Sequence, residues 1–346
     1  MKKIICYIAI GLGLGAQPLL AQDIHFSQFY ETAVLRNPAL TGIFSGDYRV
    51  TANYRNQWNS ISQPFVTGQF SAEAKIPVNT QGSDFFSAGL MTYYDKAGSI
   101  DMKTLGVYPV VAFSKSLEDS RNSYLSAGFT GGFIQRSFDP SKARVNNQYI
   151  NGVYDPYAAT NEPFNKPQIH YFDLGAGVNF SSGGGENNEL TYFLGVAGYH
   201  FTRPATGFFG DEEVKQEMKW SLNGGLTYRM SESYGLMLQA NYVRQGTFTE
   251  IIAGGLLHWK SITERASDPL LVVYAGAFYR VNDAIIPVVK VDYMRYSFGF
   301  SYDVNVSELK AATNLRGGYE LSLVKTGLFK DDRWQQSRTT CPHFFF

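Results

Sequence analysis

The sequence predicts an all-β membrane protein: a transmembrane antiparallel up-and-down β-barrel of about 14 strands, with a short N-terminal helix. Three observations predict it. Only 17% of the 346 residues are charged while 34 are Gly, whereas a soluble domain has about 25% charged residues and about 7% Gly. The chain begins like an exported protein. Many segments alternate apolar and polar side chains over about 10 to 14 residues, the length of tilted membrane strands.

The charge balance and the composition exclude two classes of protein. The 30 basic side chains match the 30 acidic ones, so the chain lacks the basic excess with which proteins bind nucleic acid. At 44% hydrophobic residues, it has too much apolar material for a disordered chain. No Pro/Ser-rich linker or block of like charges divides it, so we expect one domain.

Residues 1–21 have the pattern of a secretory signal peptide. Lys2 and Lys3 precede an apolar run, and Ala21 stands before a probable cleavage site at Gln22. Cleavage there leaves a slightly acidic chain in which Cys341 is the single cysteine, so no intramolecular disulfide can form. The fold must therefore depend on packing and hydrogen bonds.

The rest of the sequence offers no transmembrane helix. The longest stretch without Asp, Glu, Lys or Arg is 56–72, and it contains Asn, Gln, Ser and Pro. A spanning helix needs about 20 mainly apolar residues. A closed β-barrel is the other structure that satisfies every backbone polar group in lipid.

Period-two alternation marks the strands. In 219–230 the even positions are mostly apolar and the odd ones polar, and 123–136 and 296–305 alternate in the same way. Strands are predicted at 47–58, 64–76, 84–95, 102–116, 122–136, 168–181, 189–201, 218–230, 234–245, 248–260, 270–281, 284–293, 296–306 and 315–325. This count is even, as in single-chain outer-membrane barrels. The alternative is a soluble secreted β-sandwich, whose strands would be shorter and whose outer face would carry more Lys and Glu.

The connections between these strands have unequal lengths. With a periplasmic N-terminus, 231–233 and 293–295 become tight periplasmic turns, while the long stretches 137–167 and 202–217 lie outside. This asymmetry is typical of outer-membrane barrels.

The polar faces of the predicted strands place charges in the lumen. In the first strand Arg49 and Arg55 alternate with apolar residues. Charges facing the lumen can pair across it and close it, or line a wet pore; the residue types favour pairing but leave both open. The residues predicted to face the lumen are Arg49, Asn53, Arg55, Glu73, Lys75, Lys219, Arg229, Lys290 and Asp292.

We place the barrel at 47–325. On either side of it the mature chain carries a segment with apolar side chains that could contact other protein surfaces. Within 22–46, aromatic and aliphatic residues recur at helical spacing from Phe26 and stop at Asn37-Pro38, which predicts a short amphipathic helix. This helix could plug the barrel, dock on a periplasmic partner or cover the lower rim. The periplasmic tail 326–346 is polar and then apolar, so it could contact a partner or tuck under the barrel.

Catalytic and metal-binding arrangements are sparse. The five His residues have no ligand spacing, there is no Cys pair, and the Gly-rich segments lie on strands rather than before helices. His200 continues an outward-facing apolar row, which predicts a position in the membrane interface. We expect no cofactor, no metal site and no enzymatic activity.

Several segments resemble one family. DIHFSQFYETAVLRNPALTG, DYRVTANYRNQW, DAIIPVVKVDYMRYSFGFSYDVNVSEL, LRGGYELSL and the terminal CPHFFF are similar to the PorP/SprF family. The resemblance implies an outer-membrane barrel of the type IX secretion and gliding machinery in a Gram-negative bacterium. Its partners would be periplasmic and lipoprotein components, or a large secreted protein that it helps to anchor at the surface.

We therefore predict a docking and anchoring component that contacts the lipid bilayer and protein partners, and no nucleic acid. The residues predicted to bind periplasmic partners are His25, Phe26, Phe29, Tyr30, Asn37, Pro38, Cys341, Pro342 and Phe344. The alternative is a FadL-like or porin-like channel for hydrophobic or small solutes, because Asn-Pro-Ala near the mature N-terminus is also similar to FadL-type transporters.

Overall fold

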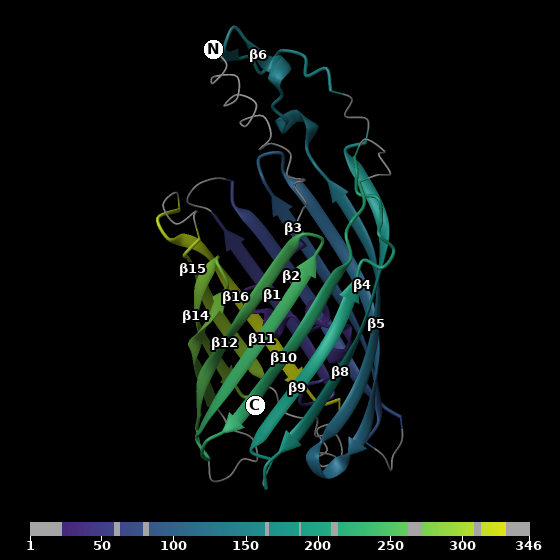
Figure 1. The fold of residues 1–346 in the computed structure, drawn as a ribbon, viewed down its shortest axis with the longest axis vertical. Helices are drawn as coiled ribbons and strands as arrows, with labels where there is room; N and C mark the ends of the chain where they lie inside the picture. Colours follow the sequence, from purple (N-terminus) through teal and green to yellow (C-terminus); the bar gives the residue numbers. More distant parts are fainter. Residues whose placement is uncertain are drawn as a thin grey trace, which may run out of the picture.

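The structure is a computed structural model that describes residues 23–58, 63–78, 83–162, 166–186, 188–208, 214–261, 271–307 and 313–329. Within these residues, fourteen antiparallel strands close into one barrel, as Figure 1 shows. The predicted all-β barrel is thus confirmed. The predicted signal peptide and the tail residues Cys341, Pro342 and Phe344 lie outside the described residues.

The barrel strands follow one another around the wall in chain order, and only two pairings join strands that are not consecutive: β5 with β8 and β1 with β16. The strands are β1 (Tyr48–Gln57), β2 (Phe65–Pro77), β3 (Phe85–Ala97), β4 (Met102–Glu118), β5 (Ser123–Ser137), β8 (Gln168–Gly184), β9 (Leu190–Tyr199), β10 (Lys219–Arg229), β11 (Tyr234–Gln245), β12 (Phe248–Lys260), β13 (Leu271–Arg280), β14 (Ala284–Tyr293), β15 (Tyr296–Asn305) and β16 (Arg316–Gly327).

The seam between the first and last strands closes the wall. β1 pairs with β16 over its whole length, from Tyr48 opposite Gly327 to Gln57 opposite Gly318. Because every strand then has two neighbours, no row of unpaired backbone N–H and C=O groups faces the lipid.

The side chains divide between the two faces of the wall as the alternation predicts. Outward positions carry exposed apolar residues such as Phe70, Phe129 and Leu194. Inward positions carry buried polar and charged residues such as Thr51 and Ser301. Lipid on one side and a polar interior on the other give each strand its period of two.

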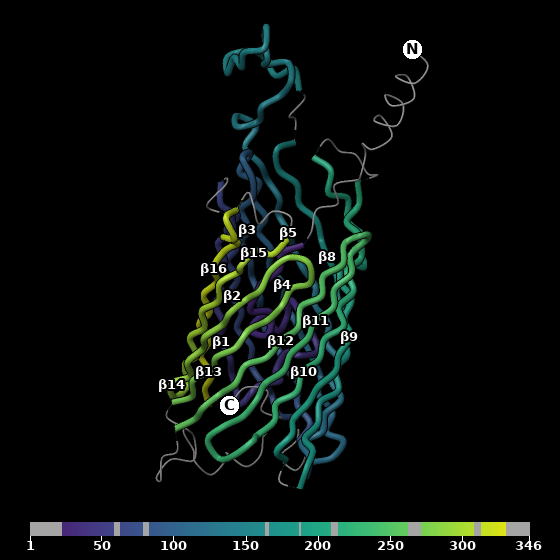
Figure 2. Tube along the Cα trace, turned by 60° about the vertical axis from the view of Figure 1, so that its left-hand side comes forward, coloured from purple at the N-terminus to yellow at the C-terminus, as the bar shows by residue number. Residues whose placement is uncertain are grey.

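The two ends of the barrel differ in their connections. One end carries the β5–β8 connection, whose residues 138–162 we call the arm, and the β9–β10 connection; the arm rises well beyond the rim (Figures 1 and 2). The other end carries η3 (Asp119–Arg121) and short turns at 230–233 and 294–295. Outer-membrane barrels have long loops outside, so we name these the outer and inner ends. The arm contains η4 (Pro140–Lys142), η5 (Asn146–Gln148), β6 (Tyr149–Ile150) and β7 (Val153–Tyr154).

Residues 23–46 lie inside the barrel, and we call them the plug. Their ribbon crosses the lumen in Figures 1 and 2, and most of their side chains are buried. The predicted helix is broken into η1 (Phe29–Glu31), the single-turn α2 (Ala33–Arg36) and η2 (Pro38–Leu40). Asn37 is extended at φ −166°, because the residue before a proline avoids the helical region. No helix among the described residues is long and apolar enough to cross a membrane.

The seam register can be tested by cross-linking. Ala52 lies directly opposite Leu323, and such pairs have Cα atoms about 4.5 to 5.5 Å apart, within the range of a disulfide. In a Cys341→Ser background, Ala52→Cys with Leu323→Cys should form an intramolecular disulfide on mild oxidation. Peptide mass analysis after proteolysis would detect it. Ala52→Cys with Leu321→Cys, displaced by two residues, should not cross-link; equal yields would contradict the register.

Candidate functional site

The candidate site is the plug together with the lumen wall that holds it. The plug begins at the outer end, where Asp23 meets the first residue of β10, Lys219. It ends at the inner end, where the ammonium of Lys75 hydrogen-bonds the Phe44 carbonyl. The segment therefore runs through the whole lumen, starting at the end opposite to the periplasmic side predicted for the N-terminus.

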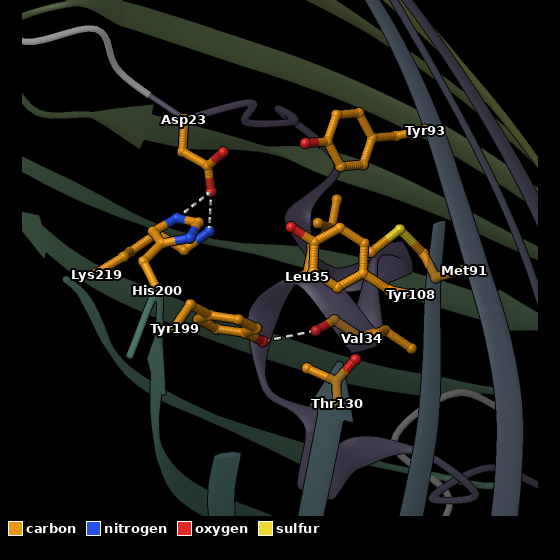
Figure 3. Close-up of a pocket in the computed structure, with 10 residues that line it drawn as sticks. All are labelled: Asp23, Val34, Leu35, Met91, Tyr93, Tyr108, Thr130, Tyr199, His200 and Lys219. Carbon is orange, nitrogen blue, oxygen red and sulfur yellow. Dashed lines mark hydrogen bonds and ion pairs between the residues drawn. The ribbon is translucent and has the colours of Figure 1, made fainter. Parts of the chain in front are cut away.

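A buried charged cluster holds the outer end of the plug. The Asp23 carboxylate accepts a hydrogen bond from the ammonium of Lys219 at 2.5 Å, and it lies 3.4 Å from Nε2 of His200. On its other nitrogen, His200 lies 2.8 Å from Asp173. Figure 3 shows Asp23 reaching both Lys219 and His200.

His200 is not at the membrane interface as predicted. It is 3% exposed and lies inside the barrel. His200 is the residue directly after the end of β9, and its φ of 61° is in the left-handed region. One residue in this conformation ends the alternation, so the side chain turns inward instead of continuing the outward row.

A small cavity remains beside this cluster. Its volume is about 10 Å³, which is about the room that one water molecule needs. Met91, Tyr93 and Tyr108 close it from the wall, and the Tyr199 hydroxyl donates to the Val34 carbonyl of the plug at 2.6 Å (Figure 3). The described plug thus leaves little free space at this level.

Below the outer cluster, carboxylates of the wall bind the plug backbone. Glu320 accepts hydrogen bonds from the amides of Ser27 and Gln28, at 2.7 and 3.0 Å. The Ser27 hydroxyl donates to Asp303 at 2.6 Å, and Arg55 makes an ion pair with Asp303 at 2.8 Å. These contacts join plug residues to wall residues almost 300 positions later in the chain.

Two charged side chains of the plug, Arg36 and Glu31, bind the wall at its middle. Arg36 donates to the side chain of Gln239 at 2.7 Å and to two wall carbonyls, and its guanidinium lies over the rings of Phe29 and Phe193. Lys290 makes an ion pair with Glu31 at 3.0 Å. The charges of the plug therefore have partners in the wall.

Asn37-Pro38-Ala39 rests on wall glycines. The side-chain amide of Asn37 donates a hydrogen bond to the Val178 carbonyl at 3.1 Å. A Cβ on Gly128 would lie 2.4 Å from the carbonyl carbon of Pro38, and one on Gly177 would lie 2.1 Å from the Asn37 side-chain oxygen. Gly128 and Gly177 face each other in the β5–β8 pair, so together they form a seat that no larger residue could provide.

At the inner end, Glu73 binds both wall and plug. It accepts three hydrogen bonds from Arg49, the shortest at 2.9 Å, and one from the amide of Gly42 at 3.1 Å. The rings of Phe44 and Phe85 lie under the Lys75 ammonium. Neutralised charges and packed rings therefore fill this end of the lumen.

The structure places the predicted site residues as follows. The residues predicted to face the lumen are buried inside the barrel, except Arg229, which is exposed at the inner end of β10. The residues predicted to bind periplasmic partners in the N-terminal segment lie in the plug; His25 is half-buried, and those fully buried are Phe26, Phe29, Tyr30, Asn37 and Pro38. Aromatic spacing marks a contact face, but it does not distinguish a partner surface from a lumen wall.

Sequence reasoning missed several residues that hold the plug. Asp303 stands on the polar face of a predicted strand and could have been found there. Glu320 could have been found in the same way in the last strand. Asp173 could likewise have been found in the strand predicted at 168–181. Asp23 and Arg36 had no such signal, because they stand outside the predicted strands and their partners lie far away in the sequence.

Ion pairs outside the wall fix the base of the arm. Asp101, in the β3–β4 turn, accepts a hydrogen bond from Lys142 of η4 and lies 2.9 Å from the ammonium of Lys96. Hydrogen bonds from Lys142 and Lys96 lower the pKa of the Asp101 carboxyl to about 2. The rings of Phe138 and Phe208 meet at 4.8 Å and join the two long connections.

Comparison with known families identifies the chain. The model of the type IX secretion system membrane protein PorP/SprF matches residues 19–324. The chain belongs to the PorP/SprF family. The family is one of type IX secretion system membrane proteins, and the closed barrel is the fold of an outer-membrane protein. None of the curated proteins compared matches the chain.

Several solved barrels are similar to the chain at low sequence identity. A Pseudomonas aeruginosa FadL homologue is 10% identical, with 85% of this chain and 94% of that one covered and a TM-score of 0.44. The P. putida toluene transporter TodX is 10% identical, with 86% and 94% covered and a TM-score of 0.43. The KdgM porin is 9% identical, with 80% and 98% covered and a TM-score of 0.35. Likenesses this distant say nothing of function.

The glycine seat can be tested by filling it. Gly128→Val should displace Asn37-Pro38-Ala39, because its Cβ would overlap the Pro38 backbone, and should lower the free energy of unfolding by about 1 to 3 kcal/mol, the usual cost of overpacking. Urea titration in lipid vesicles would measure it. Gly184→Val in β8, whose Cβ would meet nothing closer than 3.7 Å, is the control. A seat variant as stable as this control would contradict the proposed packing.

The inner ion pair can be tested by a double-mutant cycle. Arg49→Leu should cost about 3 to 5 kcal/mol of unfolding free energy, because it leaves the Glu73 charge buried without its guanidinium. Adding Glu73→Leu should recover most of that loss, since replacing both partners by apolar residues is often nearly neutral. Additive losses would show that the two side chains act independently.

Proposed function

We propose that this PorP/SprF protein is a docking and anchoring component of type IX secretion that acts by contact on both sides of the outer membrane. The observation that carries the proposal is the plug. The lumen is occupied along its length by the protein's own N-terminal segment, held by buried charges at the outer end, the middle and the inner end.

A filled lumen favours contact over conduction. A passive channel needs a continuous wet path, whereas here the inward charges are paired with the plug or with one another. Removing the plug would take from Asp303 its hydrogen bond from Ser27 and from Lys290 its ion pair with Glu31, so these contacts stabilise the plugged state. The proposed resting state is therefore the plugged barrel.

The arm supplies the proposed outer contact. Tyr149, Ile150 and Val153 are each more than half exposed, and Tyr157 is 95% exposed. They surround a tight turn at Asn151-Gly152, where both residues have positive φ as in the hairpin turns that suit short strands. Apolar side chains held this far beyond the membrane favour association with protein, and we assign them to a secreted or surface-displayed partner.

The proposed inner contact is made by the C-terminal tail. The last described residues leave the barrel at the inner end, where the Phe329 amide donates to Asp47 at 3.0 Å and its ring meets that of Tyr48. We propose that the tail beyond them, with Cys341, Pro342 and Phe344, contacts periplasmic or lipoprotein components. The N-terminal residues predicted to do so lie in the lumen, where His25 is half-buried and the others are buried, so they would take part only if the plug moved.

The outer contact can be tested by removing its apolar side chains. The combined variant Tyr149→Ser, Ile150→Ser, Val153→Ser and Tyr157→Ser should lose at least tenfold of the surface protein that co-purifies with the wild-type chain from gently solubilised membranes. Mass spectrometry would identify and quantify the partner. Asn161→Ser with Glu162→Gln, also on the exposed arm, should keep it.

The channel alternative predicts a different result in planar bilayers. If the wild-type protein alone passes ions or hydrophobic solutes steadily, and comes from membranes without secretion components, the contact role is wrong. A silent wild-type barrel that brings down such components supports it.

A further inference from the structure

The lipid-facing surface of the barrel has an irregularity where β4, β5 and β8 run side by side. The ladder between β4 and β5 has no paired residues between Val107 and Val110, because Pro109 has no backbone N–H to donate. In the β5–β8 pair, Gly131 lies opposite Leu174. A proline and a glycine thus stand next to each other on adjacent strands of a wall whose other outward positions are mostly large.

The interruption leaves a groove on the lipid-facing side. The groove has a volume of about 260 Å³. Gly131 forms part of its floor because it has no side chain, and the exposed rings of Phe129 and Phe172 stand beside it. The residues that line it are Pro109, Val110, Val111, Phe129, Thr130, Gly131 and Leu174.

Apolar side chains dominate the groove. The Pro109 carbonyl accepts a hydrogen bond from the Thr130 hydroxyl at 2.9 Å, so the proline does not leave its own oxygen bare. A groove with this lining has little to offer water or a polar ligand. It is continuous with the lipid-facing wall and lies near the middle of β4, which favours a hydrocarbon chain.

Charges at the inner end of the same strand indicate the kind of lipid. Lys115 lies four residues beyond Val111 on the outward face of β4, about 13 Å along the strand at about 3.3 Å per residue. Its ammonium makes an ion pair with Asp84 at 2.6 Å, and its side chain is 58% exposed. Adjacent opposite charges complement a zwitterionic head group, with a phosphate near Lys115 and an ammonium near Asp84.

We propose that this groove binds one acyl chain of a zwitterionic phospholipid from the inner leaflet. The head group lies at the Lys115–Asp84 pair and the chain rises along β4 to the hollow above Gly131. The site depends on the outer-membrane barrel and not on the proposed docking role, so the two can fail separately.

The test is retention of lipid by the full-length protein. Native mass spectrometry of wild type, purified in mild detergent from vesicles of phosphatidylethanolamine and phosphatidylglycerol, should show one bound phosphatidylethanolamine. Gly131→Leu fills the hollow and should lower the bound fraction at least tenfold. Lys115→Gln should lower it several-fold. Gly68→Leu, at an outward position of β2 where a Cβ would meet nothing closer than 4.0 Å, should leave it unchanged.

Heat-dependent mobility on gels would confirm that each variant is folded. If Gly131→Leu does not fold, Gly131→Ala decides, and it should lower the bound fraction about threefold. A wild-type protein that retains no lipid would overturn the proposal. So would equal retention by the glycine variants and the control, or a bound molecule with the mass of a lipopolysaccharide.

Discussion

The pairing of β1 with β16 is the contact on which the rest of the molecule depends. Lipid offers no hydrogen bonds, so a sheet in a membrane must leave no edge. Closing the wall satisfies the backbone, and it also encloses an interior that fourteen polar faces must share. Once the plug fills that interior, the inward charges have little water around them and need partners within reach.

The plug provides many of those partners. Glu320 and Glu73 accept hydrogen bonds from main-chain amides of the plug as well as pairing with or lying near wall arginines. Backbone amides are useful here because they neutralise part of a carboxylate's charge without adding a side chain that must itself be buried. The wall in turn gives up side chains at Gly128 and Gly177 to make room for Asn37-Pro38-Ala39. Plug and wall are thus complementary in shape and in charge.

The strands of the wall could be predicted from the sequence because one physical rule governs every strand. Lipid on one face and polar groups on the other force a period of two, and the observed ends of the strands lie within three residues of the predicted ones. The plug obeys no such rule. Its surroundings touch it on all sides, so the helical spacing from Phe26 could not show what it faces. The inward turn of His200 depends on a single backbone angle. The contact of Glu320 with Ser27 joins positions 293 apart, and such a pairing follows only from the closed register.

The direction of the plug sets an order of events in biogenesis. Asp23 lies at the outer end and Asp47 at the inner end, so the plug runs through the barrel from its outer mouth to its inner mouth. The outer part of the plug is bound by Arg55 of the first strand and by Glu320 of the last strand, so the full set of plug contacts exists only once the seam has closed.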